Sequence, residues 1–104
     1  MRYAYDPTAD ALYVSVLAGE IAAQVEMPDG VIVDVDFAER VLGIDVMGPD
    51  RGWSPDEVID RFHLGNDDAS FLRQLAKTEW SNHSERESRP SANAASGTPQ
   101  LVPV

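Results

Sequence analysis

Residues 31–46 read VIVDVDFAERVLGIDV, and this stretch decides the fold. Apolar side chains alternate with other residue types along both of its halves, and alternation with a period of two predicts two half-buried strands. A four-residue loop at 37–40 would join these strands into an antiparallel hairpin. Three apolar pairs then share one face: Val35 with Leu42, Val33 with Ile44, and Val31 with Val46. A slip by one residue would put valine and aspartate on the same face, so the sequence specifies this register well.

Shorter runs of alternating side chains precede this hairpin. They span residues 2–5, 11–17 and 21–27, and turn-forming residues such as Pro7, Gly19 and the sequence Pro28-Asp29-Gly30 separate them. All the connections are too short for parallel crossovers. We therefore expect an antiparallel β-meander of four to five strands.

The period of the pattern changes after Gly48. Ser54-Pro55-Asp56-Glu57 has the form of a capping box with proline at the first helical position, in which the Ser54 hydroxyl accepts the amide proton of Glu57. Asn66 or Asp67 would cap a second helix. Each helix carries an apolar stripe at helical spacing, formed by Val58, Ile59 and Phe62 in the first and by Phe71, Leu72, Leu75 and Ala76 in the second. The pattern predicts an α+β fold in which a sheet is followed by two amphipathic helices.

The sequence leaves two uses open for the second stripe. The helices either cover the apolar face of the sheet, or they leave Phe71, Leu72 and Leu75 as an exposed docking stripe for a partner or a second copy.

The last part of the chain has a different composition. Residues 81–104 are rich in serine, asparagine, alanine and proline and contain no aromatic residue. Such a segment buries too little apolar area to offset the entropy of ordering it. We expect a single small domain over residues 1–80 and a disordered tail over residues 81–104.

The charge of the chain excludes several classes of function. Its 104 residues include 18 acids and 8 lysines or arginines, giving a net charge of -10, and nine of the acids lie within residues 1–48 beside only two arginines. This balance opposes contact with the phosphates of nucleic acids. No cysteine is present, which excludes thiol nucleophiles and cysteine-built metal sites. No apolar run is long enough for a secretory leader or a membrane span, so we expect a cytoplasmic protein.

Asp34, Asp36 and Asp45 would share one face of the predicted hairpin. Three carboxylates there would form a solvated acidic face that attracts a basic protein, or they would bind Mg²⁺ or Ca²⁺ in a metal-dependent enzyme. No histidine accompanies them, because His63 lies at the expected end of a helix and His83 lies in the expected tail. We assign no catalytic residue, metal site or cofactor, and a non-enzymatic interaction module is the leading hypothesis. The open edges of such a sheet also permit pairing with a second copy.

Three blocks of residues match a known family in order and in spacing. They are Tyr5-Asp6 followed by Asp10-Ala11-Leu12-Tyr13, then Gly30-Val31 followed by Val33-Asp34 and Asp36, and finally Gly43-Ile44-Asp45. With these blocks, residues 1–48 resemble the bacterial family known as domain of unknown function 2283, in which glutamate is more usual at the position of Asp45. The resemblance implies a compact, cytoplasmic, β-rich domain and an antitoxin-like role in a two-gene module, but it supplies no activity.

The motif residues also have structural explanations. Asp6 and Asp10 flank a turn, where carboxylates accept backbone amide protons. Gly30 suits a turn that requires a positive φ, and Gly43 would let a neighbouring side chain or backbone approach closely. We expect Tyr5 and Tyr13 to pack on the sheet.

Overall fold

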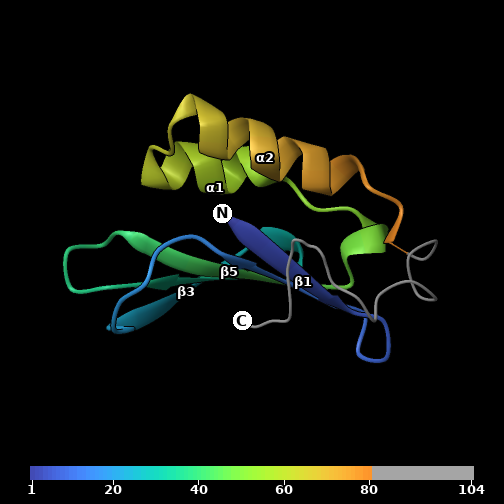
Figure 1. Cartoon of the computed structure of the whole chain (residues 1–104), viewed down its shortest axis with the longest axis horizontal. Helices are drawn as coiled ribbons and strands as arrows, with labels where there is room; N and C mark the ends of the chain where they lie inside the picture. Colours follow the sequence, from blue (N-terminus) through green and yellow to red (C-terminus); the bar gives the residue numbers. More distant parts are fainter. Residues whose placement is uncertain (81–104) are drawn as a thin grey trace.

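A five-stranded antiparallel sheet covered on one face by two helices forms the fold of this chain (Figure 1). The computed structural model describes residues 1–80, and the predicted disordered tail over 81–104 lies outside the described residues. The strands are β1 (Arg2–Asp6), β2 (Ala11–Ser15), β3 (Ala23–Met27), β4 (Val31–Val35) and β5 (Val41–Met47). The short 3-10 turns η1 (Pro28–Gly30) and η2 (Pro49–Arg51) precede β4 and follow β5, and the helices are α1 (Pro55–Phe62) and α2 (Asn66–Lys77). The predicted α+β class, with antiparallel strands followed by two helices, is confirmed.

The order of the strands differs from a simple meander. The sheet runs β1-β2-β5-β4-β3, so β2 lies beside β5 and not beside the strand that follows it in the chain. The connection between β2 and β3 instead passes along the end of the β4–β5 hairpin. The backbone amides of Val16 and Leu17 donate to the carbonyl of Leu42, and the amide of Ala22 donates to the carbonyl of Val35. In a simple meander, a tight turn would join β2 to β3. Here the longer connection instead pairs its backbone amides with carbonyl groups of the hairpin.

The hairpin register is as predicted along most of its length and differs next to the loop. Val31 pairs with Val46 and Val33 with Ile44, but Val35 pairs with Val41 instead of Leu42. The loop is shorter than expected, because the amide of Asp36 donates to the carbonyl of Arg40 and Glu39 takes a left-handed conformation with a φ of 63°. This is the common three-residue hairpin loop. Leu42 is then the extra residue of a β-bulge that restores the predicted register beyond it.

The apolar face of the sheet and the facing sides of both helices form one core. Its members that are less than 2 % exposed come from three strands, both helices and Trp80 after α2, and they include Leu12, Val14, Val33, Ile44, Val46, Val58 and Leu72. Burying one such side chain stabilises a fold by about 1.5–3 kcal/mol. The apolar side chains that alternate along the strands therefore pack against the apolar stripes of the two helices at one interface.

The docking stripe left open by the sequence is not exposed. Leu72 is 0 % exposed, Leu75 is 5 % exposed, and Phe71 packs half-buried against the same core. The interpretation of these three residues as an exposed surface is therefore wrong, because α2 needs them to cover the sheet.

The ends of the helices also differ in detail from the prediction. Ser54 precedes α1 and Pro55 is its first residue, but the Ser54 side chain makes no capping hydrogen bond; its backbone carbonyl accepts the amide of Glu57 instead. Gly65, and not Asn66 or Asp67, is the N-cap of α2. His63 closes α1 in a left-handed conformation with a φ of 55°.

Trp80 packs the end of the helical segment against the first strand. It is 1 % exposed, and its ring lies 5.4 Å from that of Tyr3 and 5.0 Å from that of Tyr5. Its backbone amide donates to the carboxylate of Asp50 at 2.6 Å, and its indole nitrogen donates to the carbonyl of Leu75 at 3.2 Å. Neither helix of the described chain has the length and apolar character needed to cross a membrane.

Candidate functional site

Two of the three acids expected on an open acidic face are buried. Asp34 on β4 is 5 % exposed and Asp36 is 8 % exposed, whereas Asp45 on β5 is half-buried. The prediction of a solvated face is therefore wrong for Asp34 and Asp36. Each of them is covered by its own hydrogen-bond partners.

Asp34 lies on the face of the sheet away from the helices, where two side chains from other strands bind it. The hydroxyl of Tyr13 donates to Oδ2 at 3.1 Å, and the side-chain amide of Gln24 donates to Oδ1 at 2.8 Å. Tyr13 belongs to β2, so its ring must cross β5 to reach this carboxylate. It does so over Gly43, which pairs with Asp34, and a Cβ atom at Gly43 would overlap the Tyr13 hydroxyl. We refer to Tyr13, Gln24, Asp34 and Gly43 as the crossing cluster.

The crossing cluster disfavours additional negative charge. Burial raises the pKa of Tyr13 to about 12, and the negative charge of Asp34, its hydrogen bond and the charge of Asp45 act in the same direction. The pKa of Asp45 is also raised, first by burial and then by the charge of Asp34. Tyr13 therefore stays protonated at neutral pH and acts as a hydrogen-bond donor, not as a base.

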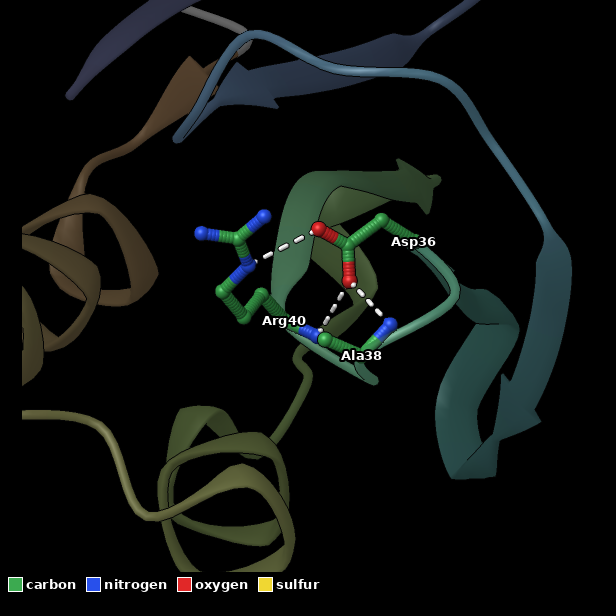
Figure 2. Close-up of polar contacts among 3 residues, drawn as sticks. All are labelled: Asp36, Ala38 and Arg40. Carbon is green, nitrogen blue, oxygen red and sulfur yellow. Dashed lines mark hydrogen bonds and ion pairs between the residues drawn. The ribbon is translucent and has the colours of Figure 1, made fainter.

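Asp36 holds the β4–β5 loop closed (Figure 2). Its Oδ1 accepts the backbone amides of Ala38 and Arg40, each at 2.9 Å, and its Oδ2 accepts Nε of Arg40 at 2.9 Å. The amide of Arg40 contributes most to lowering the pKa of this carboxyl, and the Arg40 side chain and the amide of Ala38 add to it against the opposing effect of burial. Asp36 is therefore committed to the loop.

The three acids do not form a shared set of metal ligands. Within residues 1–80, no group of three or more histidine or acidic side chains is placed to hold a metal ion. Asp36 binds its own loop, and both oxygens of Asp34 already accept hydrogen bonds from the crossing cluster. The donor geometry therefore does not favour the metal-binding alternative.

The first motif block builds the turn between β1 and β2. Oδ1 of Asp6 accepts the amide of Thr8 at 3.0 Å and that of Ala9 at 3.4 Å. The Tyr5 hydroxyl donates to Oδ1 of Asp10 at 2.7 Å, and the Asp10 carbonyl accepts the amide of Gly48 at 2.8 Å. These bonds link the turn to the segment that leaves the sheet toward the helices.

The second motif block begins at a turn that suits glycine. Gly30 has a φ of 76°, and a Cβ atom there would lie 3.1 Å from the carbonyl oxygen of Met47. A side chain at this position would therefore be both strained and crowded.

An acidic groove between β3 and α1 was not anticipated from the sequence. It has a volume of about 550 Å³, and its lining residues are Glu26, Met27, Pro28, Ser54, Asp56, Glu57, Asp60 and Arg61. The acids come from two segments about 30 positions apart, so no local sequence motif predicts the groove. The spacing of Asp56, Glu57 and Asp60, which share one side of a helix, was the available signal.

Comparison with known proteins places the strands in a family. Residues 2–48 match a family model described as protein of unknown function (DUF2283). The strand region is a DUF2283 region. The match confirms the resemblance carried by the three motif blocks, and it covers β1 to β5 but neither helix. Comparisons with curated proteins and with solved structures found no match.

The crossing cluster of the DUF2283 region generates a prediction about Gly43. Gly43→Ala should lower the free energy of unfolding by about 1–3 kcal/mol, because the new methyl group displaces the Tyr13 ring. In a Tyr13→Ala background, the same substitution should cost less than about 0.5 kcal/mol. Urea denaturation of the four proteins in this double-mutant cycle measures the difference. Equal costs in both backgrounds would show that the ring does not cross at Gly43.

Asp36 generates a prediction about pH. Its pKa is lowered in the folded state from the ordinary value of 3.8, so its ionised form stabilises the fold above that pH and the stabilisation disappears as the pH falls through the lowered pKa. Asp36→Asn should therefore lower the urea midpoint at pH 7, with a difference from the wild type that shrinks below about pH 3.8. Glu39→Gln, in the same loop but exposed, is the control and should have little effect. A difference that does not change with pH would contradict this role.

Proposed function

We propose that this protein is a non-enzymatic interaction module of the bacterial cytoplasm that binds a basic protein. The distribution of charge in the folded chain is the observation that supports the proposal. Residues 81–104 carry two acids and two arginines, so the whole net charge of -10 belongs to residues 1–80. Of the acids in that part, only Asp34 and Asp36 are buried. The remaining acids lie at the surface, where they attract a basic partner and speed its approach.

The few basic side chains do little to balance this surface. Residues 1–80 contain five arginines and one lysine. Among them, Arg40 pairs with Asp36 and Arg73 pairs with Asp56, each at 2.9 Å. The surface of the described chain therefore carries many more carboxylates than cations, and it suits a partner rich in lysine and arginine.

The roles of the chemically active side chains support a module without catalysis. Tyr13 is a protonated donor to Asp34, Asp36 closes a loop, and Asp6 and Asp10 hold a turn. Each of these groups makes at least one hydrogen bond that has a structural task. An antitoxin-like role is one form of this proposal, with the product of a neighbouring gene as the basic partner.

The test is capture of a partner by the immobilised full-length chain from a lysate of the source bacterium. We expect at least one enriched protein with a strongly basic surface at about 50 mM salt, and a weaker yield at about 300 mM, where screening shortens the range of charge attraction. The purified partner should show the same dependence in a direct titration. No enriched protein at either salt concentration, or binding that is insensitive to salt, would contradict the proposal.

A parallel melting experiment tests the metal-dependent alternative. A bound ion must raise the melting temperature of the folded chain. Addition of Mg²⁺, Ca²⁺ or Mn²⁺ should leave the melting temperature unchanged if the protein is an interaction module. A rise with one ion that is lost in the Asp34→Asn and Asp45→Asn double variant would support the alternative instead.

A further inference from the structure

The strand β3 ends the sheet on one side and has a neighbour on one side only. It pairs with β4 from Ala23 to Met27 without interruption, and no other strand of the described chain lies beside it. In an antiparallel edge strand, every second residue directs its N–H and C=O groups away from the sheet. The free side of β3 therefore offers backbone groups to another strand.

This edge has few of the features that usually prevent pairing, since Glu26 is its one charged side chain. Its sequence from residue 21 reads IAAQVEM, with no proline or lysine, and its register contains no bulge. Val25 and Met27, on the side facing the core, are only half-buried because no further strand covers them. Ile21, just before the strand, is 52 % exposed. An added strand would cover these apolar side chains.

The acidic groove lies at one end of this edge. Glu26 and Met27 of β3 line it on one side, and α1 contributes Asp56, Glu57 and Asp60 on the other. Arg73 neutralises Asp56 and the Arg61 guanidinium lies over the ring of Phe62, 5.5 Å from its centre. Glu57 and Asp60 are exposed and favour a positively charged occupant. Glu26 alternates with Val25 and Met27, so its side chain lies on the other face of the sheet, where it adds negative charge to the same end of the edge.

We propose that β3 binds an extended segment of a basic partner as a sixth strand, and that a lysine or arginine just beyond the paired residues, at the Met27 end of the edge, enters the groove beside Glu57 and Asp60. This inference rests on the proposed function and names the surface that performs it. The partner's backbone completes the hydrogen bonds of the sheet, its alternate apolar side chains cover Val25 and Met27, and its charges give specificity. A second copy of this chain fits less well, because pairing two β3 edges brings together two surfaces that both carry net negative charge.

The probe is a labelled seven-residue peptide in which lysine and valine alternate, titrated into the full-length chain. We expect saturable binding that is lost when every second backbone nitrogen of the peptide is methylated, because methylation removes the hydrogen bonds of a strand and keeps the charges. Hydrogen exchange should slow at alternate amides of residues 23–27. Equal binding of the methylated peptide, or slowing at β1 instead of β3, would overturn the proposal.

Two double variants that have the same net charge test whether the groove itself binds the peptide. Glu57→Gln with Asp60→Asn removes two acids from the groove, and Glu39→Gln with Asp67→Asn removes two exposed acids that do not line it. The groove variant should bind the peptide about fivefold more weakly, and the control variant less than about twofold. Equal losses in the two variants would show that only the overall charge matters, and would overturn the groove assignment.

The same variants distinguish failure of the β3 binding surface from failure of the proposed function. A basic partner captured from the lysate that binds the wild type and the groove variant equally would overturn the β3 surface and leave the proposed function standing. Capture of no basic protein would contradict the proposed function itself.

Discussion

The burial of one face of the sheet is the constraint on which the rest of this structure depends. Leu12, Val14, Val33 and Ile44 present an apolar surface that five strands alone cannot cover. The DUF2283 region ends with the last strand, and the cover comes from the helical segment after residue 48. Trp80 completes it by packing against the tyrosines of β1. In this chain, the family segment and the helices therefore share one apolar core.

The opposite face of the sheet is fixed by polar contacts instead of by a covering layer. The Tyr13 ring crosses β5 at the one position where a glycine leaves room, and it meets a buried carboxylate on β4. The carboxylate is hydrogen-bonded on both oxygens, and the raised pKa of Tyr13 keeps the donor protonated. These groups connect four neighbouring strands, β2, β5, β4 and β3. We propose that recognition uses the β3 edge of the sheet and the acidic groove beside it.

The sequence allowed prediction wherever the deciding interaction was local. The alternation around Val33 and Ile44 predicted the strands and most of the hairpin register, but it did not predict the bulge at Leu42, whose carbonyl accepts hydrogen bonds from the distant segment 16–17. The partner of β2 could not be read from its own alternation, because the period of a strand does not identify its neighbour. The burial of Asp34 was missed for the same reason, since Tyr13 reaches it from another strand. Motif spacing identified the family segment but could not show which of its acids are buried.

We expect the DUF2283 region of this chain to require its helices in order to fold. The most direct measurement is urea denaturation, followed by circular dichroism, of two shortened chains, one ending at Gly48 and one ending at Trp80. We expect a cooperative unfolding transition for the longer chain and none for the shorter one, because truncation at Gly48 exposes the apolar face of the sheet to water. A shorter chain that is monomeric and unfolds cooperatively would contradict it.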